Sequence, residues 1–322
     1  MENNQLSAKY PTDAQFQPPV AASDEIDLRE LFSAIWKGKW IIIATTFLFA
    51  VAGVLYAKSL PNIYKADALL APAETSGGGL SKMAAQFGGL ASLAGVSLGG
   101  GEASQTDLAA EVMKSRQFVN AFIEKHELMV PLMAAKGWDL GNNQLILNEE
   151  IYNTETQTWL RKPQGLRGAM PSQQEMYDVF VKNTLSIGSD KTSGFYTLSI
   201  KHYSPYVAKQ WTDWLIEDIN KVMRGRTIKE TTQNLVYLES QLQKTAIADM
   251  QSTFYSLIEE QTKSLMLAEV QDEFVFKVID RPVVPEMKAE PKRASICVLA
   301  TLLGGMLGMG IVLIQHAFKR ED

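Results

Sequence analysis

The sequence predicts an α+β domain flanked by two transmembrane helices, with one long helix that projects from the domain. Three observations carry this prediction. Two long uncharged runs lie near the two ends of the 322-residue chain. Strand-like and helix-like segments follow one another between these runs. Among them, the helical pattern from residue 205 to about residue 270 is almost unbroken.

Both uncharged runs are long enough to cross a membrane, with 18 residues in the first and 25 in the second. About 20 apolar residues, each rising about 1.5 Å, cross a hydrocarbon core of roughly 30 Å. A buried core helix is the alternative for each run, but a pair at opposite ends of the chain favours the membrane. We therefore predict transmembrane helices over residues 40–58 and 294–318, the first of them an uncleaved anchor.

The segments outside the two spans are short. Residues 1–22 are polar with scattered prolines and are predicted to be a disordered cytoplasmic tail. Residues 23–39 are predicted to form an amphipathic helix, because apolar side chains recur there at helical spacing. Trp36 and Trp40 favour a position on the cytoplasmic membrane surface. Residues 319–322 are predicted to be a second cytoplasmic tail.

Residues 59–293 form the large domain between the spans. Residues 64–72 alternate between apolar and polar side chains, as a strand does. Residues 76–104 are rich in Gly, Ala, Leu and Ser. We interpret them either as a small-residue helix packed close to lipid or a neighbouring subunit, or as a mobile linker. An amphipathic helix is predicted from Thr106 to Leu128.

Three local signals place further elements in this domain. Ser172 and Glu175, three residues apart, are typical of a capping box at the start of a helix. Alternating segments on either side of a turn that ends at Gly194 predict a β-hairpin. Ser204 followed by Pro205 is typical of a helix start, because the first helical turn leaves unpaired the N–H that proline lacks.

The helix that starts at Pro205 is predicted to be very long. Apolar residues mark one face as far as about Val270, and Gly225 is the one clear weak point in the pattern. A helix of about 40 residues after Gly225 would be about 60 Å long and would have to project. Its apolar stripe needs a partner, either an antiparallel neighbour or other copies of the chain. Residues 274–279 are predicted to return as a strand.

The net charge and the cysteine content limit which classes of protein are possible. The net charge is −5 without a basic tract, so nucleic-acid binding is not expected. The single cysteine, Cys297, allows no intrachain disulfide. Basic residues around the first span favour a cytoplasmic N-terminus, whereas those around the second span do not. Because the first helix usually dominates and long loops translocate regardless of charge, we expect both termini inside and the domain outside.

No combination of residues points to a catalytic site, a cofactor site or a metal site. The three histidines, His126, His202 and His316, are isolated from cysteines and carboxylates at ligand spacing. Neither a phosphate-binding Gly-x4-Gly-Lys loop nor a Gly-x-Ser-x-Gly elbow occurs. Trp211 and Trp214 could stack on a sugar, but a core position is the better interpretation. We therefore expect a protein that is not an enzyme.

The candidate functional residues are instead the prolines and glycines around the start of the second span. Pro282, Pro285 and Pro291 each fix φ near about −65° and disfavour helix in the preceding residue. They predict a semi-rigid, extended connector that sets the angle between the domain and the membrane helix. Lys292 and Arg293 are placed to reach phosphate headgroups and hold the depth of that helix.

Two glycines four residues apart lie halfway along the second span. Gly304 and Gly308, with Ala300 one turn earlier, predict a small-xxx-small ridge. Such a ridge lets another helix approach at backbone distance within lipid, where packing rather than hydrophobicity drives association. A connector that limits swivel and a ridge that joins helices together favour a defined oligomer.

The segment Pro282-x2-Pro285-x4-Glu290-Pro291-Lys292-x11-Gly304-x3-Gly308 resembles the signature of the Wzz-type polysaccharide co-polymerases, the chain-length determinants of bacterial O-antigen. The family usually has Ser where Glu290 stands. The amphipathic segment before the first span, the two terminal spans and the very long helix also resemble the family. The resemblance thus covers nearly the whole chain.

The resemblance implies a non-enzymatic protein of the bacterial inner membrane, with its large domain in the periplasm and both termini in the cytoplasm. It implies a membrane-proximal mixed α/β base with a long protruding helix, and ring-like homo-oligomers. Such proteins act with the O-antigen polymerase of the inner membrane to set the length of a lipid-linked glycan. The branch with a cytoplasmic tyrosine kinase is not expected, since the sequence has no phosphate-binding loop and stops four residues after the second span.

We therefore predict a regulator of O-antigen chain length in lipopolysaccharide biosynthesis. The alternatives within the family are a regulator of enterobacterial common antigen or of an exopolysaccharide. In a different class, a periplasmic scaffold or adaptor for a transporter is less favoured, because adaptors usually need only one membrane anchor. A ligand sensor would need an output module, and a glycan polymerase would need an acid–base pair.

Overall fold

The computed structural model describes residues 28–73 and 105–321, which fall into two compact units. One unit comprises the chain up to Ala57 and from Ala294 onward, and the other comprises Lys58–Arg293. The tail expected at residues 1–22 and the glycine-rich segment at residues 76–104 lie outside the described residues.

The first unit contains helices α1 (Leu28–Lys37), α2 (Lys39–Ser59) and α10 (Arg293–Glu321). The two uncharged runs therefore form helices, and both α2 and the Arg293–His316 part of α10 are long and apolar enough to cross a membrane. Only 11% and 17% of the residues in their most apolar stretches are buried. Apolar side chains thus cover the outside of these helices, as the hydrocarbon of a bilayer requires and as a soluble core helix would not show.

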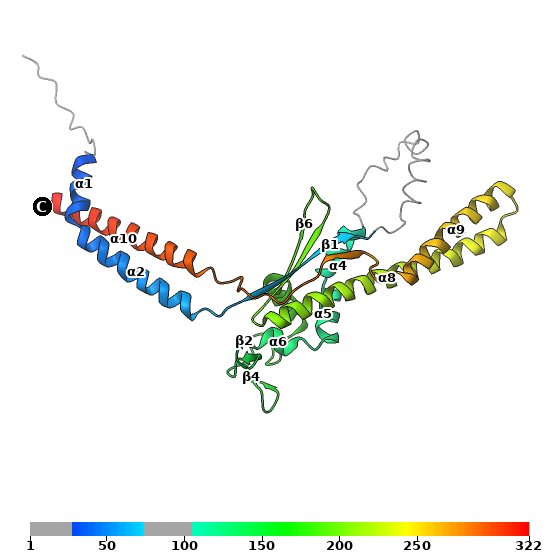
Figure 1. Ribbon diagram of the computed structural model, residues 1–322, viewed down its shortest axis with the longest axis horizontal. Helices are drawn as coiled ribbons and strands as arrows, with labels where there is room; N and C mark the ends of the chain where they lie inside the picture. The colour runs from blue at the N-terminus through cyan, green and yellow to red at the C-terminus, as the bar shows by residue number, and fades with distance from the viewer. Residues whose placement is uncertain (1–27, 74–104, 322) are drawn as a thin grey trace, which may run out of the picture. The chain divides into compact units, whose positions relative to one another are not determined.

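A four-stranded antiparallel sheet lies at the centre of the second unit (Figure 1). Its strands run in the order β6 (Leu185–Ser189), β7 (Tyr196–His202), β1 (Tyr64–Pro72) and β8 (Phe276–Asp280). β6 and β7 form the predicted hairpin, and Gly194 in its turn has φ 72°, a conformation that glycine adopts without strain. In the register of β1 and β7, Tyr64 lies opposite His202.

The core packs between this sheet and the first half of α8 (Pro205–Lys244). Strand β1 alternates as predicted, and its inward side chains are almost fully buried: Ala66, Ala68 and Leu70. Helix α8 contributes buried side chains at helical spacing: Ala208, Trp211, Leu215 and Ile219. Trp211 is only 2% exposed, so it is the core anchor that the sequence predicted. Ser204 caps α8 and Pro205 is its first residue, as predicted.

Shorter elements complete the domain. The helices are α4 (Gln105–Met113), α5 (Arg116–Lys125), α6 (Met129–Met133) and α7 (Gln173–Val179), and a π-helical turn at Phe180–Thr184 follows α7 directly. Two small hairpins come between α6 and α7: β2 (Ala135–Asp139) with β3 (Gln144–Leu147), and β4 (Tyr152–Asn153) with β5 (Thr158–Trp159).

The single helix predicted from Thr106 to Leu128 is wrong, because the chain turns before α5. Ser115 adopts an extended conformation there, and its side chain accepts a hydrogen bond from the Phe118 N–H at 3.3 Å. A serine oxygen satisfies an N–H that the first helical turn leaves unpaired. The serine therefore starts a new helix where the apolar periodicity alone indicated a continuous one.

The long helix is confirmed, but it passes through Gly225 and ends at Lys244. Its 40 residues extend about 60 Å. A three-residue turn, Thr245–Ile247, then reverses the chain, and α9 (Ala248–Val270) packs back along α8 (Figure 1). The single helix of about 40 residues predicted after Gly225 is therefore wrong, because the chain turns after Lys244. Gly225 itself does not break α8, since a glycine costs only about 1 kcal/mol within a helix. Of the two partners that the apolar stripe allowed, the antiparallel neighbour from the same chain is the one observed.

Candidate functional site

The connector that the prolines predict runs from the end of β8 to the start of α10. Residues 281–292 contain no helix and only one isolated bridge. Pro282 is buried, Pro285 and Pro291 are half-buried, and Lys292 is exposed. Because each proline restricts its own φ and the residue before it, this stretch has few alternative conformations.

Hydrogen bonds attach the connector to the segment that precedes β1. The Ile63 N–H donates to the Glu290 carbonyl at 2.9 Å, and the Ala289 N–H donates to the Ile63 carbonyl at 2.8 Å. The Glu290 carboxylate also accepts from Nζ of Lys201, on β7, at 2.6 Å. Glu290, which departs from the family pattern, thus has a charged partner in this chain. The sequence could not indicate Lys201, because it lies 89 residues away.

Arg293 adds a third attachment at the end of the connector. Its Nη2 donates to the Leu60 carbonyl at 3.4 Å and to Oδ1 of Asn62 at 3.1 Å. Of the two basic side chains expected at lipid headgroups, Arg293 is therefore bound to the domain and only Lys292 is exposed. The segments that enter and leave the domain consequently lie side by side.

The ridge glycines, Gly304 and Gly308, face α2 of the same chain. A Cβ atom added to Gly304 would lie 2.6 Å from Cβ of Phe49. One added to Gly308 would lie 2.9 Å from Cα of Ile42 and would also collide with Oγ1 of Thr45. Ordinary contacts of a Cβ atom fall at 3.4–4 Å, so only glycine permits this approach of the two helices.

The facing helix contributes a small residue of its own. A Cβ atom on Gly53 of α2 would lie 2.6 Å from Cβ of Ala300. Gly53 and Ala57 are both buried and are spaced four apart, the signal by which sequence reasoning could have found this second ridge. In this structure the helix that packs on the ridge is the chain's own first span. The six motif residues are thus divided between the domain and the helix pair.

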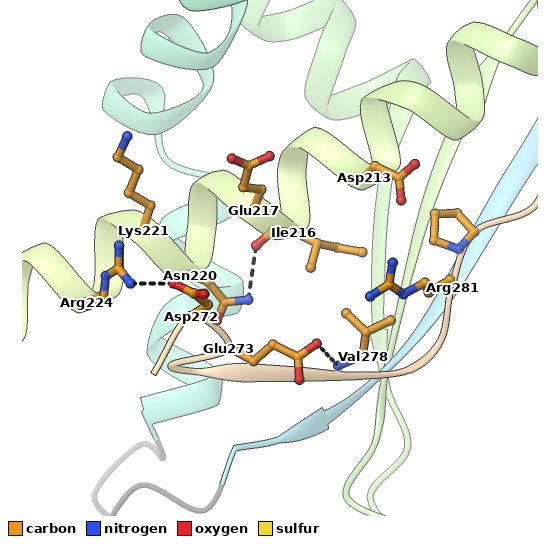
Figure 2. A pocket seen from close by; sticks show the side chains of 11 residues that line it. Asp213, Ile216, Glu217, Asn220, Lys221, Arg224, Asp272, Glu273, Val278 and Arg281 are labelled. Atoms are coloured by element: carbon orange, nitrogen blue, oxygen red, sulfur yellow. Dashed lines mark hydrogen bonds and ion pairs between the residues drawn. The ribbon is translucent and has the colours of Figure 1, made fainter. Parts of the chain in front are cut away.

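A groove of about 540 Å³ lies where the connector leaves the sheet, between α8 and the β8 segment (Figure 2). The apolar side chains that line it are Ile216, Val278 and the motif residue Pro282. The charged side chains that line it are Asp213, Glu217, Lys221, Arg224, Asp272, Glu273 and Arg281. Arg224 donates to Asp272 at 2.9 Å. The nearly balanced charges give the groove no preference for an anion or a cation.

Asn220, also in this groove, fastens β8 to α8. Its Nδ2 donates to the Phe276 carbonyl at 3.0 Å and to the Ile216 carbonyl at 3.1 Å. Its Oδ1 accepts from the backbone N–H groups of Val275 at 2.8 Å and Phe276 at 3.0 Å. The amide is therefore saturated within the domain, and its role is to hold the strand from which the connector starts.

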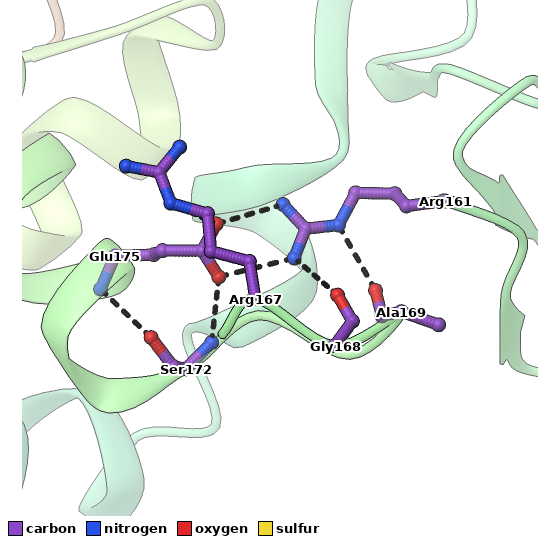
Figure 3. Close-up of polar contacts among 6 residues, drawn as sticks. All are labelled: Arg161, Arg167, Gly168, Ala169, Ser172 and Glu175. Atoms are coloured by element: carbon purple, nitrogen blue, oxygen red, sulfur yellow. Dashed lines mark hydrogen bonds and ion pairs between the residues drawn. The ribbon is translucent and has the colours of Figure 1, made fainter. Parts of the chain in front are cut away.

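A second polar cluster fixes the loop at residues 161–170 against the start of α7 (Figure 3). Arg161 donates to both carboxylate oxygens of Glu175, at 3.3 and 3.1 Å, and to the Ala169 carbonyl at 2.9 Å. Ser172 and Glu175 form the predicted capping box. The hydrogen bonds from Arg161, followed by that from Ser172, hold the pKa of Glu175 below its ordinary value.

The histidines of the domain have partners within it, and Nε2 of His126 lies 2.9 Å from Oδ2 of the buried Asp218. His202 is buried, its Nε2 donates to the Pro131 carbonyl at 3.0 Å, and its Nδ1 accepts from the Ser204 N–H at 3.1 Å. Burial lowers the pKa of His202 from its ordinary value. His126 stacks on Trp214 with ring centroids 4.2 Å apart. Among the described residues no three His, Cys, Asp or Glu side chains are grouped so that they could hold a metal ion.

Two family models match the chain. The model described as "Chain length determinant protein" (Wzz) matches residues 24–126, which include α2 and β1. The model described as "G-rich domain on putative tyrosine kinase" (GNVR) matches residues 230–317, which include α9, the connector and the ridge glycines.

Known proteins match shorter parts of the chain. The ferric enterobactin transport protein FepE of Escherichia coli K12 is 38% identical over 72 residues, which are 21% of this chain and 19% of FepE. The tyrosine-protein kinase Wzc of Salmonella typhi is 36% identical over 61 residues, which are 19% of this chain and 8% of Wzc. The chain therefore matches less than a fifth of the length of either relative.

Among solved structures, a full-length bacterial polysaccharide co-polymerase is similar to the chain with a TM-score of 0.37 and 16% identity, over 92% of this chain and 99% of that one. The matched family model defines a chain length determinant domain in the first third of the protein. The resemblance of the sequence to the Wzz-type chain-length determinants is thereby confirmed over residues 24–126.

Proposed function

We propose that the chain regulates the length of a bacterial surface polysaccharide, and specifically the O-antigen of lipopolysaccharide. The observation that carries the proposal is the match of residues 24–126 to the chain length determinant family. The second family match, over residues 230–317, includes the proline connector and the glycine ridge by which the sequence first resembled the family. The first match includes the apolar helix α2, and the second includes the apolar part of α10.

In this proposal the chain is a two-pass protein of the inner membrane, with both termini in the cytoplasm and residues 59–293 in the periplasm. The exposed apolar side chains of α2 and α10 support the proposal that both helices span the membrane. The excess of basic residues before the first span supports the proposed orientation. Reporters fused near Ser204 and at the C-terminus test this topology. Periplasmic activity at Ser204 and cytoplasmic activity at the C-terminus are expected, and the reverse would contradict the orientation.

We further propose that the protein acts without catalysis, as a homo-oligomeric ring that organises the O-antigen polymerase around its lipid-linked glycan. The connector supports this role, because Pro282, Pro285 and Pro291 stiffen the backbone that joins the domain to α10, and a stiff joint limits rotation. Limited rotation lets neighbouring copies meet at one angle, as a closed ring requires.

Deletion of the gene, followed by separation of the surface glycan by size, tests the function. The modal length of the O-antigen is expected to change and to return when the gene is restored. An unchanged O-antigen with altered enterobacterial common antigen or exopolysaccharide would identify one of those glycans as the substrate instead. No change in any of the three would reject length control.

A second candidate, a scaffold for a transporter, is favoured by one observation: a relative that matches 72 residues is named a ferric enterobactin transport protein. Uptake of the iron-loaded siderophore by the deletion strain separates the two functions. Lost uptake with normal glycan lengths would support the transport role, whereas normal uptake with altered lengths would support length control.

A further inference from the structure

Three aromatic rings meet at the end of the domain where β1 starts. Tyr64 is the first residue of β1, Trp138 lies on β2, and Tyr206 lies in the first turn of α8. The ring centroids of Tyr64 and Trp138 are 5.8 Å apart, and those of Trp138 and Tyr206 are 6.0 Å apart. Because these contacts join three elements, the rings form one continuous aromatic surface.

This surface is open to the outside of the domain. Tyr206 is 49% exposed, whereas Tyr64 and Trp138 are half-buried. Leu140, in the turn that follows β2, is 77% exposed. The turn has an ordered structure, since Nε1 of Trp138 donates to Oδ1 of Asn143 at 3.0 Å. We call the surface formed by Tyr64, Trp138, Leu140 and Tyr206 the aromatic end.

The covalent chain keeps the aromatic end close to both apolar helices. Tyr64 comes five residues after Ser59, the last residue of α2, so at most roughly 18 Å of extended chain separates them. Glu290, whose carbonyl accepts from the Ile63 N–H, comes three residues before Arg293, the first residue of α10. A surface joined so closely to two membrane spans is within reach of the lipid headgroups.

The residue types suit the boundary between water and hydrocarbon. Tyr and Trp are enriched there, because each combines an apolar ring with a polar O–H or N–H group. Helix α2 already carries exposed aromatic residues near both of its ends, Trp40 at 73% and Tyr56 at 61%. Tyr64 begins the aromatic end eight residues after Tyr56, so aromatic side chains continue from the span into the domain.

Exposed lysines lie in the same two segments as the aromatic end and the connector. Lys136 is exposed on β2, and Lys288 and Lys292 are exposed on the connector. A lysine stem follows apolar surface while its ammonium group reaches a phosphate. A phospholipid layer offers acyl chains to Leu140, a polar boundary to the rings and phosphates to the lysines. One partner thus matches all three kinds of side chain.

We propose that the aromatic end binds the lipid surface of the membrane that α2 and α10 span, with Leu140, Trp138 and Tyr206 in the headgroup layer. The proposal rests on the proposed function for the two spans. These three residues lie outside both ranges that match the family models, 24–126 and 230–317. Lipid binding there would fix the tilt of the domain on the membrane, in addition to the stiff connector.

Fluorescence quenching of the full-length protein in nanodiscs tests the proposal. The discs contain phosphatidylethanolamine and phosphatidylglycerol, some of it with a nitroxide on the headgroup. Cys297→Ala removes the native thiol, and Leu140→Cys then carries a fluorescent label. We expect the nitroxide to quench this label severalfold more than a label at Ile247→Cys, which is 60% exposed in the turn after α8. Because α8 extends about 60 Å, the two labels report on its opposite ends.

Removal of the rings distinguishes lipid binding from mere proximity. In the protein labelled at position 140, Trp138→Ser and Tyr206→Ser should each lower the quenching about twofold or more, as the loss of one ring from an interface would. Tyr255→Ser is the matched control, because Tyr255 is 62% exposed on α9. If Trp138→Ser unfolds the hairpin, Tyr206→Ser, at an exposed position, replaces it.

Three results would overturn the proposal. The first is equal quenching at positions 140 and 247, and the second is quenching at position 140 that neither ring variant lowers. The third is a label at position 140 that is shielded from a water-soluble quencher and is also unquenched by the lipid nitroxide. A second copy of the chain or another protein would then cover the aromatic end.

Failure of lipid binding is distinguishable from failure of the proposed function. If reporters place Ser204 in the cytoplasm while the label at position 140 is quenched as expected, the proposed orientation fails and lipid binding stands. If gene deletion alters glycan length but the labels at positions 140 and 247 are quenched equally, lipid binding fails and length control stands.

Discussion

Replacement of Gly308 by alanine should loosen the contact between the two apolar helices. The new Cβ would lie 2.9 Å from Cα of Ile42, where an ordinary contact is 3.4–4 Å. Because Cα belongs to the backbone, no side-chain rotation relieves the clash, and α2 and α10 must separate by about 0.5 Å or more. A gap of roughly 0.5–1 Å already removes a quarter to a half of the attraction between each pair of atoms in the contact.

We expect the helix pair to lose about 1–3 kcal/mol, the usual cost of an extra methyl group in a packed contact. The higher helix propensity of alanine returns up to about 1 kcal/mol, which leaves a net loss of about 0–2 kcal/mol. Gly310→Ala is the matched control, because nothing lies within 4 Å of a Cβ at that position. Gly310→Ala should gain the higher helix propensity of alanine without a steric clash against α2.

The single cysteine provides the assay. Cys297 is half-buried on α10, and its Cα lies 4.0 Å from the position of a Cβ on Gly53 of α2. A maleimide dye that fluoresces on reaction with a thiol should label Cys297 faster once the helices separate. On heating in mild detergent, Gly308→Ala should give a midpoint several degrees below that of the unchanged protein, and Gly310→Ala should not.

Equal midpoints for Gly308→Ala and Gly310→Ala would refute the reasoning that close glycine packing holds the two helices together. The double variant Gly304→Leu and Gly308→Leu extends the test to function. It should weaken assembly in detergent or alter glycan length. Unchanged behaviour in both measurements would show that the ridge has no part in either.

Three further predictions concern the domain. Lys201→Glu and Glu290→Lys should each destabilise it by less than about 1 kcal/mol, because the pair is partly exposed, and the double exchange should recover the loss in urea unfolding. Failure to recover would exclude the ion pair as the cause. Burial depresses the pKa of His202 in the folded state. As the pH falls, the imidazole of the unfolded chain is therefore protonated before that of the folded chain, and stability should fall below about pH 6.5. His202→Gln should flatten that slope, and an equal slope in the variant would assign the pH dependence to other groups. The pKa of Glu175 is also lowered, so its contribution is present above its ordinary pKa of 4.5 and is lost as the pH falls below it. Arg161→Gln should therefore cost more stability at pH 7 than at pH 3 in guanidinium titrations, and equal losses would contradict this assignment.

The elements that the sequence predicts correctly are those with a local signal. Ser172 with Glu175, Gly194, and Ser204 with Pro205 each act on the few residues around them, and each signal has the structure expected. The apolar spacing of β1 and of the two long uncharged runs is likewise a property of one segment. Local steric and hydrogen-bonding preferences thus determine where these elements begin and end.

The predicted helix boundaries are wrong where the local sequence preference is weak and contacts with other segments determine the structure. The turn at Thr245–Ile247 contains neither glycine nor proline, and it forms because α9 can cover the apolar face of α8. Gly225, which does carry a helix-breaking signal, lies within the helix. In the same way Ser115, in a stretch with continuous apolar spacing, begins a new helix.

The candidate site shows the same division. The prolines and the two ridge glycines could be named from their spacing, because backbone restriction and small size are properties of the residue itself. Their partners could not be named, since Lys201, Gly53 and Asn220 reach the connector, the ridge and β8 through contacts between distant parts of the chain.

The hydrogen bonds between Ile63 and Glu290 bring the first and last residues of the domain together. A chain whose ends meet can be closed by a short linker and cut elsewhere, and the turn at Thr245–Ile247 offers a place for the new ends. The domain could thus be produced as a circularly permuted protein without either anchor, with its sheet order unchanged. Membrane attachment and folding of the domain are, on this view, separable properties of one polypeptide.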